Sequence, residues 1–445
     1  MLTLKKRDEN PVFTSFSHTP MYLSDVPFPA VTICSEIKIK QSEYNVTDYF
    51  GRFLMKNLTD EEKQRVLDVL LFCNRGLAPI EGSKDVAVTN HTVDLKTLDV
   101  IFGHAPLLKN VVEYTDPQLY FNHFSPTLTN FGICYSFNML DKSELFTETT
   151  YIHKNHLVHP KIYHWNIDKN YDEIHNSAFP PRASEFAEFS LGLGTDTSEE
   201  TRICNPFSGY KLILHHPAEF PTLTTRYIPL SLDTIYNIWI KPEVTITSEN
   251  LENYEYHKRN CFYSPERRLK FFKVYTKHNC KIECVANNTL ALCNCIPYYL
   301  PHEESTKICG WGQLKCVSNA KEQILRNSRS INSRKMLKQC NCLPLCTSIT
   351  YSAEAHQVKY PENPYMAKPT DVYLSFQDEE LQVMERQELF SNSDFWASCG
   401  GILGLFAGFS VISLAEIIYF VTIRWLGDLW PFGNGRCNDK RFLFF

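Results

Sequence analysis

The residues with the clearest chemical potential lie in one apolar stretch near the C-terminus, GGILGLFAGFSVISLAEIIYF, which runs from Gly400 to Phe420. Gly408, Phe409 and Ser410 begin about eight residues into it, which is roughly 12 Å at the rise of an α-helix. Glycine allows a non-helical backbone, and backbone carbonyl or serine oxygens can replace the water shell of an ion. Because irregular backbone at that depth of a membrane persists only beside water or protein, the motif predicts an ion-contacting site.

Small residues recur along the same stretch. Ala397, Gly401, Gly404 and Gly408 step by four, three and four residues, so a helix would carry them on one face. In a plain anchor such glycines are merely tolerated, since membrane helices contain more glycine than soluble ones. The spacing favours a larger role, because small residues let helices approach closely, as subunits packed around an axis require.

Glu416 is the single charged residue between Gly400 and Ile423. An ionisable group in a membrane span costs several kcal/mol unless it faces water or a partner, so its position indicates function. The alternative is that Glu416 lies close enough to the inner interface to reach water. The residues alone leave both explanations open.

The stretch is long enough to cross a bilayer once, since about 20 apolar residues suffice. The chain contains no second stretch of this kind, and its first thirty residues lack the apolar run of a signal peptide. Beyond the stretch, an excess of basic residues and two interfacial tryptophans predict a cytosolic C-terminus. The residues are Arg424, Arg436, Lys440 and Arg441 against Asp428 and Asp439, with Trp425 and Trp430.

The rest of the chain has the composition of an extracellular domain. Ten of its sixteen cysteines fall between Cys261 and Cys346, here called the cysteine block, and such density is typical of oxidised proteins. The net charge of −5 does not suggest a nucleic-acid binder. N-glycosylation sequons begin at Asn45, Asn57, Asn90 and Asn287. Together these features predict an extracellular location for roughly residues 1 to 395.

Zinc binding is the alternative explanation for the cysteine block, because C-x-C and C-x₃-C pairs can be ligand pairs. The block lacks the C-x₂-C spacing of zinc ribbons, and no histidines occupy ligand positions. Structural disulfides are therefore favoured, and no metal or other cofactor is predicted. Spacing alone leaves the disulfide connectivity open.

Local patterns predict several helices and strands. The segment FPAVTICSE indicates a strand ending at Cys34, and Thr59 followed by two glutamates caps a helix from Asp60 to about Leu71. Further strands are expected at residues 130–138, 209–217 and 236–247, the last interrupted by Pro242, and a helix is expected from Ser318 to about Leu337.

The cysteine block resembles a known family. Its segments CKIECVANNTLALCNCIPYYLP, CGWGQLKC and CNCLPLC resemble the thumb domain of the epithelial sodium channel, degenerin and acid-sensing ion channel superfamily. Within this superfamily, these segments are most similar in sequence to the arthropod pickpocket branch. PFPAVTICSE and NFGICYSFN match two further landmarks, so the resemblance extends from about Asn10 to Ile423.

The resemblance implies an α+β membrane protein with a β-rich palm and β-ball. Residues 1–396 would be extracellular, 397–423 the pore-lining transmembrane helix, and 424–445 a short cytosolic tail. A helical finger would occupy about 40–135, and a disulfide-stapled thumb about 261–346.

The resemblance also implies a nested set of disulfides. No confident partner is implied for Cys73 or Cys204, and their pairing with each other stays open. The implied pairs are Cys34 with Cys134, Cys261 with Cys346, Cys280 with Cys342, Cys284 with Cys340, Cys293 with Cys316, and Cys295 with Cys309.

Pore residues follow from the same resemblance. Gly408, Phe409 and Ser410 match the family's selectivity filter, although Phe409 is bulky where acid-sensing members carry alanine. Ala397 matches the degenerin position at the outer mouth, where a small side chain lets the gate close. Glu416 would lie below the filter, in the inner vestibule.

The chain departs from the family in two respects. Members have two membrane helices, and this sequence begins where the first would deliver the chain to the outside, so we expect that helix to be missing from it. The aromatic residue that couples thumb to membrane in acid-sensing members is replaced by Lys258, with Tyr254, Tyr256 or Phe262 as candidate substitutes.

The function implied is that of a subunit of a homo- or heterotrimeric, sodium-permeable, amiloride-sensitive channel of the plasma membrane, gated through its extracellular domain. The alternative is a non-conducting single-pass receptor or accessory chain, which would not need the motif at Gly408–Ser410. An enzyme is excluded, because G-x-S-x-G, H-E-x-x-H and phosphate-binding glycine motifs are absent from the sequence.

Overall fold

The computed structural model divides the chain into two units, Thr14–Arg386 and a second made of Met1–Phe13 with Gln387–Phe445. Each unit is treated by itself below. The residues described are 11–72, 92–93, 95–107, 112–115, 124–156, 188–194, 204, 208–223, 226–327, 340–360, 369–389, 392–408 and 410–424.

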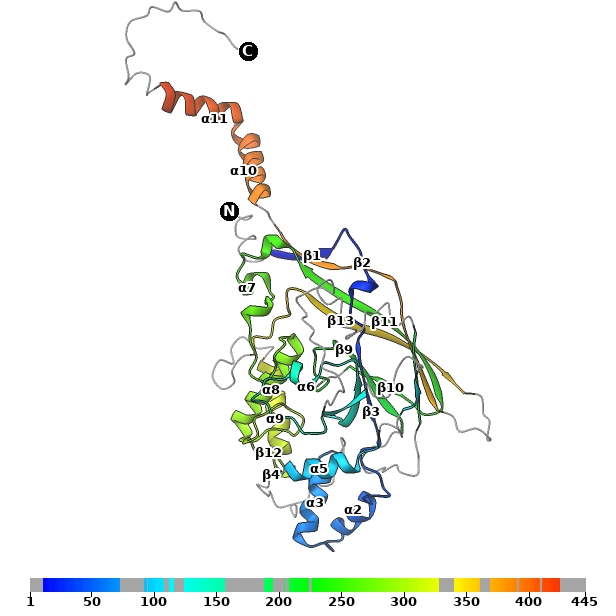
Figure 1. Cartoon of the computed structure of the whole chain (residues 1–445). Helices are drawn as coiled ribbons and strands as arrows, with labels where there is room; N and C mark the ends of the chain where they lie inside the picture. Colours follow the sequence, from blue (N-terminus) through cyan, green and yellow to red (C-terminus); the bar gives the residue numbers. More distant parts are fainter. Residues whose placement is uncertain are drawn as a thin grey trace, which may run out of the picture. The chain divides into compact units, whose positions relative to one another are not determined.

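The largest sheet has seven strands in the order β1-β16-β11-β14-β8-β5, with β13 paired to β11. β11 pairs antiparallel with β13, which lies beside it (Figure 1). It pairs parallel with both β14 and β16. The strands are β1 (Val12–Phe16), β5 (Val112–Thr115), β8 (Glu188–Leu193), β11 (Thr234–Thr247), β13 (Ser348–Lys359), β14 (Thr370–Phe376) and β16 (Met384–Glu388).

Pro242 does not interrupt β11, so this part of the prediction is wrong. The strand continues through Pro242, which pairs with Tyr351 of β13. On the other side of β11, β14 pairs only as far as Ile240 and β16 begins only at Thr245. Pro242 therefore lies where β11 has a neighbour on one side only, and a missing N–H is tolerated at such a position.

A second sheet has five antiparallel strands in the order β10-β9-β3-β7-β6. The strands predicted at FPAVTICSE, NFGICYSFN and GYKLILHHP are present as β3, β7 and β9. The bounds are β3 (Ala30–Ser35), β6 (Phe124–Thr129), β7 (Gly132–Phe137), β9 (Tyr210–His215) and β10 (Ile228–Leu230).

The main core lies between these two sheets. It combines Val31 and Ile33 of β3 with Ile238 and Ile240 of β11, and Phe28 stacks on Phe189 at 5.7 Å between ring centroids. Alternation along each strand sends these apolar side chains to one face. The two sheets therefore stabilise each other by burying their apolar faces.

The opposite face of the five-stranded sheet is polar yet buried. The Thr32 and Ser136 hydroxyls lie 2.7 Å apart, Thr127 donates to Ser136 at 2.8 Å, and Thr32 Oγ1 lies 2.8 Å from His215 Nε2. Hydrogen bonding within this row offsets the cost of removing its polar groups from water.

Two short pairings complete the strands described: β2 (Met21–Tyr22) with β15 (Glu380–Leu381), and β4 (Thr92–Val93) with β12 (Ile308–Cys309).

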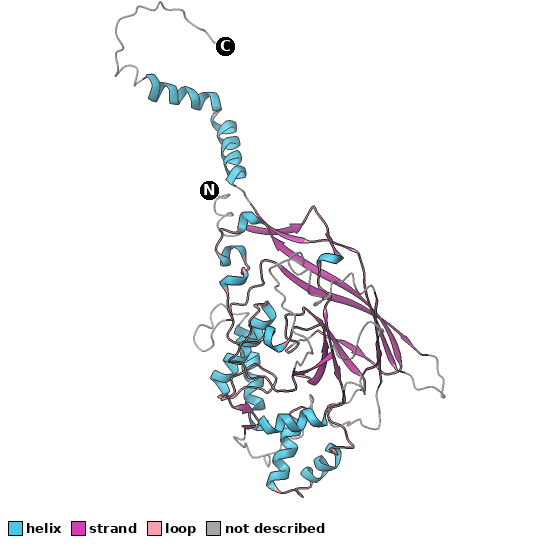
Figure 2. Cartoon of the chain, in the orientation of Figure 1, coloured by secondary structure: helices cyan, strands magenta, loops and turns pink. Residues whose placement is uncertain are grey.

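Helices and strands occupy separate regions of the Thr14–Arg386 unit (Figure 2), as an α+β arrangement requires. The helix predicted from Asp60 is α3, whose Thr59 and Glu62 form a reciprocal capping box. The helix expected from Ser318 begins earlier, at Leu314, and residues 328–337 of that prediction lie outside the described residues. The helices are α2 (Val46–Leu54), α3 (Asp60–Leu70), α5 (Leu95–His104), α6 (Lys142–Leu145), α7 (Tyr256–Arg259), α8 (Lys277–Cys293) and α9 (Leu314–Asn327).

Candidate pore segment and the disulfide-linked domain

The apolar C-terminal stretch forms two helices in place of the single helix predicted over 397–423. α10 covers Asn392–Ala407 and α11 covers Val411–Ile418, and a π-helical turn follows at Tyr419–Arg424. Within the described part of the chain, no helix combines the length and apolar character that one membrane crossing needs. The helical hydrogen-bond ladder is interrupted between Ala407 and Val411, which is where the sequence analysis placed an irregular backbone.

The interruption has a defined backbone geometry. Gly408 has φ +62°, in the left-handed region, and an added Cβ would meet nothing within 4 Å. A side chain at Gly408 is therefore disfavoured by the backbone conformation and not by space. Phe409, the middle residue of the predicted filter, lies outside the described residues.

Ser410 starts the second helix. Its Oγ accepts a hydrogen bond from Ser413 N at 3.2 Å, as an N-cap does, and its carbonyl accepts from Leu414 N at 3.1 Å. Ser410 Oγ also lies 3.2 Å from Ser413 Oγ, within hydrogen-bonding distance. Because a serine hydroxyl has two acceptor lone pairs and one proton, these two contacts leave one further hydrogen-bonding or ion-binding position on Ser410 Oγ.

The predicted small-residue face lies on α10. Ala397 and Gly401 are exposed, Gly404 is half-buried, and an added Cβ at Gly401 would meet nothing within 4 Å. The apolar side chains are exposed around both helices, including Leu405 at 81%, Phe406 at 83% and Ile412 at 73%. Helices that are apolar on every side are stable when lipid or other helices surround them.

Glu416 lies on α11 and is exposed. Its helical neighbours Ile412 and Ile417 are exposed as well, at 73% and 50%. The carboxylate therefore projects from an otherwise apolar helix, which is the arrangement that made it a candidate.

The cysteine block is held by five disulfides, with Cα–Cα distances between 4.9 and 5.9 Å. All ten of its cysteines are paired, so none remains as a thiolate ligand for zinc. Cys204 is also disulfide-bonded, and Cys399 is free. The five pairs are those implied by the resemblance: Cys261–Cys346, Cys280–Cys342, Cys284–Cys340, Cys293–Cys316 and Cys295–Cys309.

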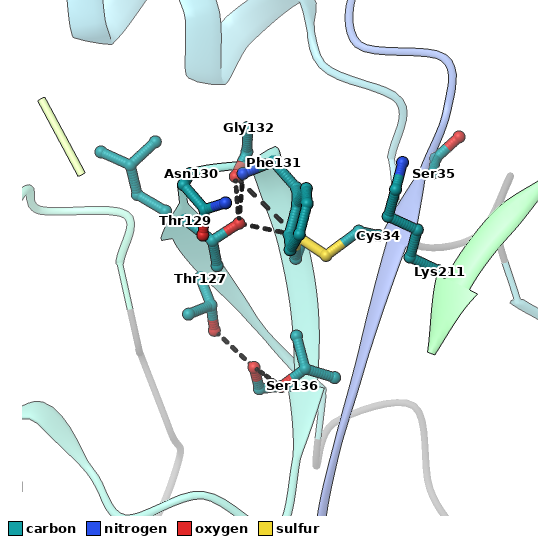
Figure 3. The surroundings of a disulfide bond; sticks show 12 residues. Cys34, Ser35, Thr127, Thr129, Asn130, Phe131, Gly132, Ser136 and Lys211 are labelled. Carbon is teal, nitrogen blue, oxygen red and sulfur yellow. Dashed lines mark hydrogen bonds between the residues drawn. A yellow bond between two sulfur atoms is a disulfide. The ribbon is translucent and has the colours of Figure 1, made fainter. Parts of the chain in front are cut away.

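A further disulfide joins Cys34 of β3 to Cys134 of β7 inside the five-stranded sheet (Figure 3), again as implied. Both cysteines are fully buried. Thr129 Oγ1 lies 3.1 Å from Cys134 Sγ and accepts from Phe131 N at 3.0 Å. The Lys211 ammonium lies 5.3 Å from the centre of the Phe131 ring, so the β6–β7 turn is held from both sides.

The candidate coupling aromatics lie at the start of the cysteine block. Tyr256 packs on Phe262 at 5.1 Å between ring centroids, and Phe262 packs edge-on against Tyr275 at 5.6 Å. Phe262 is buried, whereas Tyr256 on α7 is 42% exposed. The structure thus brings two of the three proposed substitutes together, and Tyr254 contributes its carbonyl oxygen to Arg259.

Arg259 is a residue that the sequence analysis missed. Its side chain is 2% exposed, pairs with Glu266, donates through Nε to Cys261 O at 3.2 Å and lies 4.4 Å from the Tyr263 ring centre. Partial burial acts to raise the pKa of Glu266, but hydrogen bonds from Arg259 and from Tyr263 N outweigh it and lower that pKa. In the sequence, Arg259 follows His257 and Lys258 and resembles part of an ordinary charged surface segment. Its burial becomes evident only from its contacts in the folded structure.

The sequon asparagines that are described are accessible. Asn45, Asn57 and Asn287 are all exposed, and Asn45 caps α2 by accepting from Asp48 N at 3.0 Å. Asn90 lies outside the described residues.

Comparison of the sequence with known proteins identifies a matching family. The family model for the amiloride-sensitive sodium channel matches residues 1–420. The chain is similar to Pickpocket protein 28 of Drosophila melanogaster, with 22% identity over 94% of this chain and 70% of that protein.

Two further proteins match this chain over a shorter length. Pickpocket protein 11 of Drosophila melanogaster is 28% identical over 53% of this chain, and the Homo sapiens bile acid-sensitive ion channel is 23% identical over 53%. The chain covers 47% and 50% of these two relatives, about half of their length. Because the family model spans almost the whole chain, the protein belongs to the amiloride-sensitive sodium channel family, which consists of ion channels and not of enzymes.

Proposed function

We propose that this protein is a subunit of a trimeric, sodium-permeable, amiloride-sensitive channel, with Gly408, Phe409 and Ser410 as its selectivity filter. The observation that carries the proposal is the interrupted helix at Gly408–Ser410 within an apolar segment. An uninterrupted anchor would need neither the left-handed glycine nor the serine that follows it. Sodium ions and bilayer lipid are the partners proposed for this segment.

The two helices together supply enough length for a crossing. At about 1.5 Å per residue, neither α10 nor α11 alone reaches the roughly 30 Å of a hydrocarbon core. Aligned end to end, with the non-helical residues between them, they would exceed it, although α11 turns away from the direction of α10 here (Figure 1). Backbone groups freed from the helix at such a depth need water, an ion or protein as partners, and a pore provides water and ions.

Neighbouring subunits would surround the pore. The face of Ala397, Gly401 and Gly404 lets three helices approach an axis closely, and the exposed apolar side chains of α10 and α11 would contact lipid or other subunits. Related subunits of the same family can supply the other two positions, so the trimer would be homo- or heteromeric. Glu416 would then face the water of the inner vestibule, where its charge is tolerated.

The larger unit would be extracellular. Its disulfides form and persist in oxidising compartments, and its exposed sequon asparagines are available to glycans. The palm, β-ball, finger and thumb assigned from the resemblance would convert an external signal into pore opening. The basic C-terminal tail would remain in the cytosol, at the plasma membrane.

Substitution of Ser410 tests the filter. The full chain is co-expressed with related family subunits in oocytes, and the reversal potential is measured in sodium and in potassium for wild type, Ser410→Ala and the matched control Ser398→Ala on α10. We expect Ser410→Ala to lower the sodium-to-potassium permeability ratio severalfold and Ser398→Ala to leave it unchanged. Surface-expressed Ser410→Ala channels with wild-type selectivity would contradict the filter assignment.

Ala397 tests the gate. Ala397→Val should raise the resting current severalfold, because a larger side chain at the outer mouth holds the helix ends apart. Ala397→Gly serves as the control, since it adds no volume. A resting current in Ala397→Val equal to that of wild type would remove the gating role, and a chain that reaches the surface but never carries current would favour a non-conducting accessory protein.

A further inference from the structure

A pocket of about 410 Å³ lies at the start of the cysteine block, where residues 264–275 meet Thr147. Its volume falls in the range of about 300–1,000 Å³ that is typical of pockets for small molecules. The pocket is open to solvent, so a ligand can enter from outside. Its wall combines three cations, Arg267, Arg268 and Lys273, with three side chains that carry apolar surface, Leu269, Phe272 and Tyr275.

The backbone around this basic pocket is held in place by the segment that follows α6. Phe272 forms an antiparallel bridge with Phe146, and Lys273 N donates to Leu145 O at 2.9 Å. The pocket segment also lies between two disulfide-bonded cysteines. These disulfides are Cys261–Cys346 and Cys280–Cys342. A ligand would therefore bind here with little further ordering of the backbone, which favours affinity.

The three cations of the wall have no carboxylate partner among the described residues, and all three are exposed. The carboxylates nearest to them in sequence have other partners. Glu266 pairs with Arg259, and Glu283 Oε2 accepts a hydrogen bond from Phe271 N at 2.9 Å. Neither glutamate lines the pocket. The positive charge of the wall is thus not neutralised by the described part of the chain.

The surroundings of the basic pocket are positive as well. Residues 258–281 contain eight lysines and arginines and one glutamate, although the whole chain has a net charge of −5. Burial lowers the pKa of Lys277, and the charges of Lys281 and Arg386 lower it further. Clustered cations of this kind raise the local concentration of anions, and a bound anion would relieve their mutual repulsion.

The apolar part of the wall lies next to the cations. Leu269 is half-buried, and Phe272 and Tyr275 are buried. The Tyr275 hydroxyl already donates to Leu343 O at 2.7 Å, so the ring is the part of this side chain left for a ligand. Burial raises the pKa of Tyr275 to about 12, while the charge of Arg267 acts in the opposite direction. This effect of Arg267 requires its guanidinium to lie near Tyr275.

We propose that the basic pocket binds a small organic anion that carries two or three acidic groups on an apolar body. Arginine presents a planar fork of donors that matches a carboxylate, sulfate or phosphate group through two hydrogen bonds. Arg267 and Arg268 would each bind one such group, and Lys273 would add a third charge. The apolar body would contact Leu269 and the Tyr275 ring.

Trimesate, a benzene ring with three carboxylates, is the probe for the first test. Isothermal titration calorimetry on the purified full chain in detergent, at physiological salt, should show one site per chain with a dissociation constant below about 1 mM. A cryo-EM map of the same sample should show trimesate density between Arg267, Arg268 and Lys273. Absence of binding would overturn the proposal. The readout is binding, so it does not depend on whether the protein conducts ions.

Substitution of the arginines tests their individual roles. Arg267→Gln and Arg268→Gln should each weaken trimesate binding about tenfold, because each removes a charge-assisted pair. Arg268→Lys keeps the charge but loses the planar fork, so it should restore only part of that loss. Wild-type affinity in both glutamine variants would overturn the site.

A charge-matched control separates a defined site from general attraction. The variant Arg267→Gln, Arg268→Gln, Lys273→Gln should lose trimesate binding. The control Lys241→Gln, Lys307→Gln, Lys315→Gln removes the same charge from exposed positions that do not line the pocket, and its affinity should change less than about twofold. Denaturant unfolding verifies that both variants are folded. An equal loss of binding in the two variants would assign it to net charge and overturn the site.

Two simpler anions test the ligand class. Benzoate keeps the ring but has one carboxylate, and inorganic sulfate has charge without a ring. Each should bind at least about tenfold more weakly than trimesate. Sulfate binding as tight as that of trimesate would show that the apolar body has no role. Benzoate binding as tight as that of trimesate would show that the additional acidic groups have none. Either result would overturn the proposed ligand class.

Discussion

The Thr14–Arg386 unit and the α10–α11 segment are both rich in apolar residues, but they place them oppositely. Phe28, Phe189 and Ile238 are fully buried between two sheets, whereas Leu405 and Phe406 of α10 are more than four-fifths exposed. The first region obtains its apolar environment from its own sequence, through sheet packing and disulfides. The second requires an environment supplied by lipid or by other chains.

This contrast predicts where single changes act on folding and where they act on function. Removing cross-links or titrating buried groups should change the stability of the larger unit. Altering the interruption in the smaller segment should change conduction while the larger unit stays folded.

The largest effect is expected from the Cys34–Cys134 disulfide. It joins residues 100 positions apart, and loss of a disulfide of this kind costs about 2–5 kcal/mol. Cys34→Ser combined with Cys134→Ser should therefore lower the free energy of unfolding by that amount and reduce surface expression. Cys399→Ser, which removes the free thiol of α10, should leave denaturant unfolding unchanged. Equal stability of the double variant and wild type would show that the sheets alone suffice.

A smaller and pH-dependent effect is expected at Glu219. Burial raises its pKa from the usual 4.5 to about 7, while a hydrogen bond with Thr276 acts in the opposite direction. The folded chain thus holds this proton to higher pH than the unfolded chain. The associated stability is fully present below about pH 4.5 and is lost as pH rises through about 7.

Glu219→Gln should remove this dependence. Between pH 5 and pH 8, wild type should lose on the order of 1–3 kcal/mol more stability than Glu219→Gln, after allowance for partial solvent screening. Glu243→Gln on the exposed face of β11 is the matched control and should follow wild type. Parallel pH profiles for wild type and Glu219→Gln would place this carboxyl in water.

The smallest energetic effect, about 1–2 kcal/mol, is expected from Gly408→Ala, because an L-residue disfavours the left-handed conformation found there. The functional consequence should nevertheless be large, since a shifted interruption moves the proposed filter. Gly400→Ala lies within α10 and should conserve the selectivity, because alanine suits a helix better than glycine. If Gly408→Ala channels kept the reversal potentials of wild type, the helix interruption at Gly408 would have no role in ion selectivity.

Local signals predicted much of the larger unit. The capping residues Thr59 and Glu62 located α3, and short apolar runs located β3, β7 and β9, because these features depend on neighbours in sequence. The disulfide pairs came from the family resemblance and not from spacing. The continuation of β11 through Pro242 was missed, because it depends on which strands lie beside it, and sequence position alone does not reveal this.

The candidate site was predicted in part. Gly408 correctly indicated irregular backbone, but the sequence could not show that the interruption extends to Ser410 and starts a new helix there. The burial of Arg259 was missed as well, since its partners Glu266 and Tyr263 fix it only after the chain has folded.

The disulfides of the cysteine block also bear on the order of folding. Sequence separations rise from 14 for Cys295–Cys309 to 56 for Cys284–Cys340 and 85 for Cys261–Cys346. Loop-closure entropy grows with loop length, so the innermost pairs are the easiest to form first. Once Cys284 and Cys340 are joined, Cys280 lies four residues before Cys284 and Cys342 lies two residues after Cys340, so the second pair is already close together. Oxidation can therefore proceed from the inner pairs to the outer ones, because each disulfide shortens the loop that the next one must close.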